Sequence, residues 1–253
     1  MARIFITGST DGLGRLAAES LIQQGHRVIV HARSEIRAME AGFTDIEDVV
    51  IGDLSSIAEM REVSAQVNEL GGLDAIIHNA GVGYRPPFVE TEDGLPHVFA
   101  INTLAPYLLT ALIQKPGRLI YMSSGLHREA DTSLNDVIWR KRRWKGLQAY
   151  CDSKFHDILL AFAVARRWPD VLSNSLEPGW IPTRMGGPEA PEDPRDGTAT
   201  QVWLAVSNDP EALVSGQHFY HQRVRDPHPH TYDVDRQNQL LVECAGISGV
   251  ELN

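Results

Sequence analysis

The sequence has few of the features that mark secreted or membrane proteins. It contains two cysteines in 253 residues, Cys151 and Cys244. That number excludes a disulfide framework and fits a reducing compartment. No apolar run approaches the length of about 18 residues that a membrane-spanning helix needs. The first strand-like run begins almost at residue 1, without the pattern of a signal sequence. We therefore expect a soluble, cytoplasmic protein with no membrane partner.

Basic residues are also scarce. Lys and Arg number 23 against 33 Asp and Glu, which gives a net charge of −10 and a pI near 5.4. This balance argues against nucleic acid or an anionic membrane surface as a partner. The segment 139–145 runs against the trend, with five cations beside Trp139 and Trp144. We interpret it as an amphipathic helix with solvated cations and inward-packed tryptophans.

Strand-like apolar runs alternate with helical patterns along the chain, and no Pro/Ser-rich linker divides it. This alternation predicts an α/β fold. We expect one Rossmann-type doubly wound domain over residues 1–253, with a mainly parallel seven-stranded sheet and helices on both faces. The predicted strands are residues 3–7, 27–31, 48–52, 75–79, 117–123, 171–177 and 217–220.

Two later segments are set apart from this alternation. Residues 184–197 hold three prolines and three glycines, which is typical of a mobile loop. Residues 223–253 form a C-terminal segment beyond the core motifs, with a short helix expected at 234–244.

The first predicted strand runs directly into a glycine-rich turn and then a helical pattern. Such a turn lets the backbone approach a pyrophosphate, and the helix N-terminus offers free N–H groups and a positive dipole end. The spacing Gly-x-x-x-Gly-x-Gly therefore predicts a dinucleotide phosphate site. Its residues are Gly8, Ser9, Thr10, Asp11, Gly12, Leu13 and Gly14.

Tyr150 and Lys154 are four residues apart, so on a helix they share one face. A phenol has an unperturbed pKa of about 10, and an adjacent cation favours its ionised form. Ser123 and Ser124 end the fifth predicted strand. A hydroxyl from Ser124 could hold a carbonyl oxygen while Tyr150 transfers a proton to it.

In these motifs the chain resembles the short-chain dehydrogenase/reductase family. In residues 139–154 and 31–33 it is most similar to the retinol-dehydrogenase-like group and the soluble bacterial relatives of that group. The resemblance covers residues 2 to about 220. It implies that Tyr150 is the acid or base, that Lys154 lowers the pKa of Tyr150 and binds ribose, that Ser124 orients the substrate, and that Asn102 holds a water. It further implies cofactor contacts, in addition to the glycine turn, from Asp53, Leu54, Asn79, Ala80, Gly81, Pro178, Gly179, Ile181 and Thr183 as well as from Tyr150 and Lys154.

The end of the second strand bears on the choice of cofactor. Ala32 stands where NAD-binding relatives tend to carry Asp, and Arg33 with Ser34 suits a 2′-phosphate. Asp11 and the nearby acid Glu35 instead favour NAD. We expect NADP, with NAD left open.

The expected activity is NADPH-dependent reduction of an aldehyde or ketone, or the reverse oxidation of an alcohol. Reduction of a conjugated C=C bond and a non-catalytic NADP-binding sensor are the alternatives. By resemblance, residues 184–197 close over the substrate. We expect Tyr84, Phe88 and Trp180 to line the pocket, which favours a hydrophobic substrate; ordinary packing is the alternative for all three. The short helix after Asn102 leaves both a homodimer and a monomer open.

We expect no metal site. His218, His221, His228 and His230 match no zinc-binding spacing, and the stretch that carries the last two reads as a loop.

Overall fold

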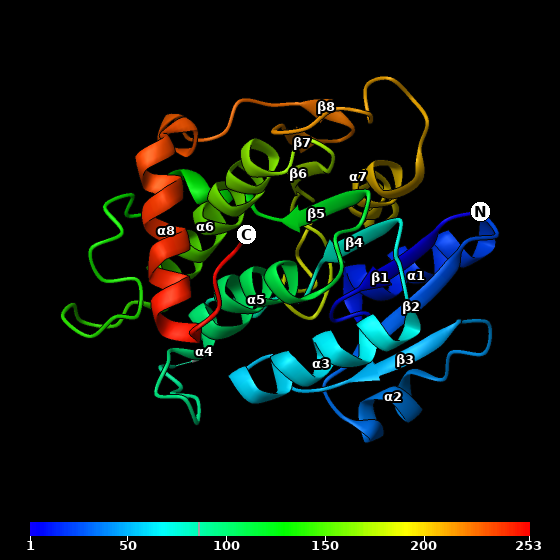
Figure 1. The fold of residues 1–253 in the computed structure, drawn as a ribbon, viewed down its shortest axis with the longest axis horizontal. Coiled ribbons are helices and arrows are strands. Elements are labelled where there is room, and N and C mark those ends of the chain that lie inside the picture. The colour runs from blue at the N-terminus through cyan, green and yellow to red at the C-terminus, as the bar shows by residue number, and fades with distance from the viewer. Residues whose placement is uncertain (86) are drawn as a thin grey trace.

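Eight strands form one sheet in the computed structural model, which describes residues 1–85 and 87–253 (Figure 1). The strand order is β3-β2-β1-β4-β5-β6-β7-β8. Every neighbouring pair is parallel except β7 and β8, which are antiparallel. The strands are β1 (Arg3–Ile6), β2 (Arg27–Ala32), β3 (Asp48–Ile51), β4 (Ala75–His78), β5 (Arg118–Met122), β6 (Leu172–Glu177), β7 (His218–Tyr220) and β8 (Arg223–Val224).

Helices connect the strands and cover both faces of the sheet, as predicted. The α-helices are α1 (Gly12–Gln23), α2 (Glu35–Ala41), α3 (Ile57–Leu70), α4 (His97–Phe99), α5 (Ala105–Leu112), α6 (Gly146–Arg167), α7 (Pro194–Val206) and α8 (Val234–Ser248). A π-helical turn, η1 (Ala100–Leu104), joins α4 to α5, and η2 (Gly125–Glu129) and η3 (Pro229–Tyr232) are 3₁₀ turns.

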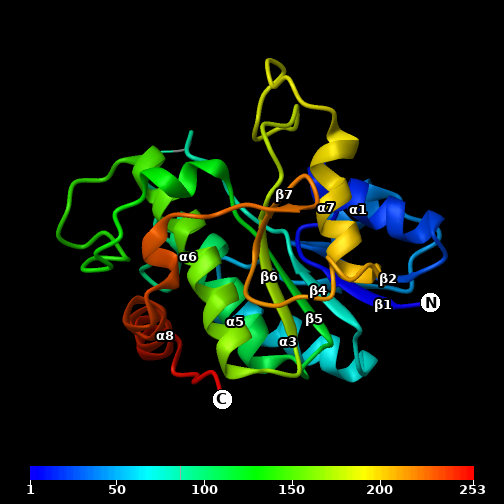
Figure 2. The ribbon, with the colours of Figure 1, turned by 90° about the horizontal axis from the view of Figure 1, so that it is seen from above.

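Alternate residues of each strand feed two separate cores, because successive side chains of a strand point to opposite faces. Phe5 belongs to the core under α3, α5 and α6, whereas its neighbours Ile4 and Ile6 belong to the core under α1 and α7. Figure 2 shows these two helical layers on opposite sides of the strands. Burial on both faces explains why the central strands are almost continuously apolar.

The sheet has one strand more than the seven predicted. The additional strand, β8, follows a two-residue turn at His221 and Gln222, whose φ angles are 49° and 59°. Positive φ at both positions defines a turn that usually carries Asn-Gly or Gly-Gly. Because His-Gln lacks that signature and β8 is only two residues long, the sequence did not reveal it.

The segment 184–197 is shorter as a loop than predicted. Its last four residues form the first turn of α7, whose N-cap is Asp193 and whose first residue is Pro194. Proline is favoured at this position because its missing N–H has no intrahelical partner there. The proline that indicated a loop is therefore part of a helix start.

The C-terminal helix α8 packs on the outside of α5 and α6 (Figure 1). Its side chains Leu240, Leu241 and Cys244 join the core beneath those helices. The face of α5 and α6 that points away from the sheet is thus partly covered by the chain's own C-terminal segment. Among residues 1–85 and 87–253, no helix is both long and apolar enough to cross a membrane.

Leu240→Ala is expected to lower the free energy of unfolding by about 2–5 kcal/mol, because it leaves a cavity under α8. The side chain of Leu240 is 0% exposed, whereas that of Val242 on the same helix is 70% exposed. Val242→Ala is the matched control, with an expected change within about 0.5 kcal/mol. Urea unfolding of both variants measures the difference. Equal effects would mean that α8 does not stabilise the fold.

Candidate functional site

The predicted site residues gather at one edge of the sheet, where the parallel strands have their carboxyl ends. This is the edge at which open α/β sheets bind ligands. The glycine turn follows β1, Arg33 and Ser34 follow β2, and Asp53 and Leu54 follow β3. The remaining residues lie after β4, after β5, after β6 or on the helices that follow, namely Asn79, Ala80, Gly81, Asn102, Ser124, Tyr150, Lys154, Pro178, Gly179, Ile181 and Thr183.

The glycine turn is closely packed against the end of β4. A Cβ atom on Gly8 would lie 2.9 Å from the Cα of Ala80, and one on Gly14 would lie 2.6 Å from the Gly8 carbonyl oxygen. Gly8 also has a φ of 61°, which favours glycine. Asn79 donates from Nδ2 to the carbonyl of Thr7 at 2.9 Å. Two predicted motifs therefore meet, and the turn's glycines are required by space and conformation.

The buried ring of His31 is hydrogen-bonded to the glycine turn. Its Nδ1 accepts from the N–H of Gly8 at 2.9 Å, and its Nε2 lies 2.8 Å from the carbonyl oxygen of Gly52. Burial lowers the pKa of His31 to about 4, so the ring is neutral, with its proton on Nε2. His31 thereby links the ends of three strands. These contacts join residues more than 20 positions apart in the chain, so no local pattern predicts them.

Two arginines follow β2, and one of them, Arg37, approaches the glycine turn. Arg33 is exposed, and Ser34 accepts from the N–H of Arg37 and so caps α2. The guanidinium of Arg37 lies 3.7 Å from the carboxylate of Asp11 in the glycine turn. The sequence analysis identified Arg33 but missed Arg37. Its position one helical turn further along was the available signal.

The helix α6 brings Tyr150 and Lys154 to one face, with the Lys154 ammonium 5.8 Å from the centre of the Tyr150 ring. The ammonium donates to the carbonyl of Met122 at 2.7 Å and to Asp157 at 2.8 Å. A Cβ atom on Gly81 would lie 3.7 Å from the Lys154 nitrogen, so the end of β4 adjoins this group.

Opposing effects set the proton affinity of Tyr150. Burial raises the pKa of its phenol, while the charge of Lys154 and the hydroxyl of Ser124 lower it. Burial outweighs them, and the carboxylate of Asp157 also raises the pKa of Tyr150. Burial raises the pKa of Asp157 itself to about 7, against the effect of Lys154. The charge of Lys154 therefore favours the phenolate, but burial and the Asp157 carboxylate, which was not predicted from the sequence, oppose it.

Asn102 lies in the π-helical turn η1 and is completely buried. Its side chain accepts from the N–H of Val82 at 2.8 Å and donates to Ser153 at 3.0 Å. Four residues further on, Pro106 has no N–H, so the Asn102 carbonyl cannot accept the usual helical bond. Single π turns are frequent at functional sites.

The loop after β6 lies over Tyr150 and the glycine turn. The Met185 sulfur is 3.9 Å from the Tyr150 hydroxyl, and a Cβ atom on Gly12 would lie 3.8 Å from Thr183. The carboxylate of Glu192 accepts from the N–H of Trp180 at 2.7 Å and lies 3.0 Å from Nε2 of His221. The loop is thus tied to the hairpin of β7 and β8.

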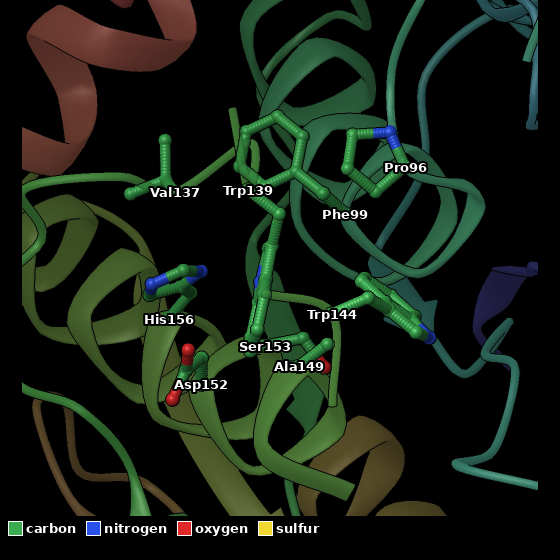
Figure 3. Close-up of a pocket in the computed structure, with 9 residues that line it drawn as sticks. All are labelled: Pro96, Phe99, Val137, Trp139, Trp144, Ala149, Asp152, Ser153 and His156. Carbon is green, nitrogen blue, oxygen red and sulfur yellow. The ribbon is translucent and has the colours of Figure 1, made fainter. Parts of the chain in front are cut away.

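The cation-rich segment 139–145 is not a helix, contrary to our prediction. The Asp136 carboxylate instead accepts from the backbone N–H groups of Arg140, Lys141 and Arg142. The tryptophans do pack inward. The two rings meet edge-on at 5.1 Å between their centres, and Figure 3 shows both beside Ala149 in a small pocket that Phe99 and His156 also line.

The cations of this segment are partly engaged within the protein. The Arg142 guanidinium lies 3.7 Å from the centre of the Trp139 ring and 2.6 Å from the carboxylate of Asp152. These contacts fix the loop before α6 in place, and they agree with a packing role for the segment.

The aromatic residues predicted to line a substrate pocket are separated. The Tyr84 ring meets Tyr150 edge-on at 5.7 Å between ring centres, whereas Phe88 packs against Trp144 at 5.2 Å. Trp180 is exposed and donates from its indole N–H to the Gly186 carbonyl. Of the three, only Tyr84 contacts Tyr150.

Comparisons with known proteins identify related chains. The sequence profile of the short chain dehydrogenases matches residues 2–135. The chain is similar to short-chain dehydrogenase chry4 of Gibberella zeae, at 42% identity over 258 residues covering 100% of this chain and 99% of that protein. It is 29% identical over 283 residues to human retinol dehydrogenase 13, covering 98% and 85%. The crystal structure of a protein from Mycobacterium paratuberculosis has the same fold, with a TM-score of 0.85, 24% identity and coverage of 100% and 95%.

Proposed function

The chain belongs to the short-chain dehydrogenase/reductase family, and from that premise we propose that it reduces an aldehyde or ketone with NADPH, or runs the reverse alcohol oxidation. The family uses NAD(P). The observation that carries the proposal is the group of Tyr150, Lys154 and Ser124 next to the glycine turn. All of it lies at the carboxyl edge of one sheet whose strands span residues 3–224. We accordingly treat the chain as one cofactor-binding domain.

In the proposed reaction the hydroxyls of Ser124 and Tyr150 bind the carbonyl oxygen of the substrate. NADPH supplies the hydride to the carbonyl carbon when it is bound. Tyr150 donates its proton to the oxygen, and the ammonium of Lys154 stabilises the phenolate that remains. The Asn102 carbonyl, which receives no helical bond from Pro106, offers an acceptor for a water that returns a proton from solvent.

The apolar surroundings of Tyr150 support a hydrophobic substrate. Tyr84 and Met185 approach the phenol from two sides, and both belong to loops at the mouth of the site. A thioether is flexible and polarisable, so Met185 can adapt to substrates of different shape. Carbonyl compounds with aromatic or aliphatic bodies are therefore the class to test first.

The preference for NADP rests on the two arginines that follow β2, of which Arg37 approaches the glycine turn. Replacing both Arg33 and Arg37 with Ala is expected to raise the KM for NADPH by about 10–100-fold, because charge-assisted bonds to a 2′-phosphate are lost. The KM for NADH should change little. Arg27→Ala is the control, since Arg27 begins β2 at its far end and pairs with Glu47. A double variant that keeps its affinity for NADPH would refute this assignment.

The activity itself is tested by following NADPH oxidation across aldehydes, ketones, quinones and enones. Turnover of a carbonyl compound that Tyr150→Phe abolishes supports the proposal. Turnover of enones alone would favour reduction of conjugated C=C bonds. NADPH binding without turnover of any class would favour the sensor and contradict the proposal.

A further inference from the structure

Three buried side chains converge behind the loop that carries Ser124. His127 belongs to η2, Glu177 ends β6, and His218 begins β7. One nitrogen or oxygen atom from each lies within 4.8 Å of those of the other two. Their residues are 0%, 2% and 1% exposed, respectively. This trio is separate from the proposed group around Tyr150.

Outer partners hold both imidazole rings by their Nδ1 atoms. Nδ1 of His127 donates to the Ser124 carbonyl at 2.6 Å, and Nδ1 of His218 lies 2.9 Å from the hydroxyl of Ser175. Metal-binding histidines are usually held in this way through the ring nitrogen that does not bind the metal. Nε2 of His218 is left without a partner in the described part of the chain, whereas that of His127 accepts a 3.1 Å bond from the backbone N–H of His228, which a bound ion would have to displace.

Two polar atoms of the trio have no hydrogen-bond partner in the described part of the chain. They are Nε2 of His218 and Oε2 of Glu177. The other carboxylate oxygen of Glu177 pairs with Arg225. Buried polar groups are rarely left unpaired, because desolvation then goes uncompensated. These atoms therefore indicate that something further binds between them.

We propose that His127, Glu177 and His218 bind one divalent transition-metal ion, for which Zn²⁺ is the best match. Two imidazoles and one carboxylate are a recurrent zinc ligand set, with a fourth position left for water. Bonds of about 2.0–2.2 Å in a tetrahedron place ligand atoms about 3.4 Å apart. The ligand atoms of the trio now lie within 4.8 Å of one another. Each separation therefore has to shorten by no more than about 1.4 Å for an ion to bind.

The charges around the trio define the conditions for binding. Burial lowers the pKa of His127 to about 4 and that of His218 well below its usual range, so both rings are neutral near pH 7. Arg225 and Arg128 bring positive charge close to Glu177 and oppose a cation. We therefore expect binding that is weaker than in a site without arginines.

The bound ion would act as a structural link. It would join η2, which positions the Ser124 carbonyl, to the end of β6 that leads into Pro178 and Gly179, and to β7. The site differs from the one considered in the sequence, because only His218 of the four histidines weighed there takes part. His221 faces Glu192, while His230 is exposed and bonds Thr132.

Equilibrium dialysis of the chelator-treated full chain against Zn²⁺ alone tests the proposal. We expect one ion per chain and a melting temperature that rises with Zn²⁺. His218→Asn and Glu177→Gln should each weaken binding by at least about tenfold, as losses around metal sites commonly do. His230→Asn is the matched control and should bind like the wild type.

Melting curves in chelator show whether each variant is folded. If His218→Asn does not fold, a folded Glu177→Gln still tests the proposal. Wild-type binding no tighter than that of the folded variants would overturn the proposal, and so would binding lost only in His230→Asn, which would identify surface histidines. The readout is metal content, so its failure does not bear on the proposed reductase.

Discussion

Tyr150→Phe is expected to lower kcat/KM for carbonyl reduction by about 10²–10⁴-fold, the usual contribution of a positioned acid or base. The variant loses only the phenol oxygen, and its ring keeps the edge-on contact with Tyr84. NADPH affinity should stay close to that of the wild type. Initial rates of NADPH oxidation and the quenching of protein fluorescence by NADPH measure the two quantities separately.

Tyr84→Phe is the matched control for this experiment. It removes a second phenol oxygen at the same mouth, from a ring whose centre is 5.7 Å from that of Tyr150. No proton transfer is assigned to it, so a change of only a few fold is expected. Comparable losses in both variants would mean that the phenols act by packing or polarity, and full activity in Tyr150→Phe would remove Tyr150 from the mechanism.

Asp157→Asn is expected to move the pH dependence of alcohol oxidation to lower pH. The Asp157 carboxylate lies 2.8 Å from the Lys154 ammonium and opposes its effect on Tyr150. The amide keeps the shape of the side chain but carries no charge, so the effect of Lys154 on the phenol is no longer opposed by a carboxylate. We expect the apparent pKa of the rising limb of kcat/KM to fall by about one unit.

The pH range in which the two profiles differ follows from the pKa of Asp157, which burial raises to about 7. Below that pH the carboxyl is mostly neutral, and the variant and wild type should behave alike. Above it the wild-type carboxylate is charged and raises the pKa of Tyr150, so the two profiles separate there. Asp152→Asn on the same helix is the control, because its carboxylate pairs with Arg142 and not with Lys154. Profiles that coincide above pH 7 would show that Asp157 does not tune Tyr150.

Most site residues were predicted from patterns that span only a few positions of the chain. The strand-turn-helix from Ile4 to Gly14 and the spacing of Tyr150 and Lys154 are each contained within a few residues. Their geometry follows from backbone periodicity alone. Asp157 was also within reach, since it lies three residues after Lys154 on the same helix face. Asp157 was not predicted because the Tyr-x-x-x-Lys motif ends at Lys154 and does not include it.

Three local predictions were wrong because a neighbouring side chain or strand decided the backbone conformation. The segment 139–145 alternates cations and tryptophans as an amphipathic helix does, yet the Asp136 carboxylate takes its backbone N–H groups. Pro194 indicated a loop and is instead the first residue of α7. The turn before β8 uses His221 and Gln222 in place of the usual glycine, so pairing with β7 decides its conformation.

By itself, the sequence determined the family, the parallel sheet and the residues proposed for hydride and proton transfer, because these follow from short spacings and from the period of apolar residues. Only the tertiary structure decided which charges meet. Arg37 lies beside Asp11, and His127, Glu177 and His218 converge from elements up to 91 residues apart in the chain. Such groups are neighbours because the sheet and its connecting helices bring distant elements side by side, and no spacing along the chain records that arrangement.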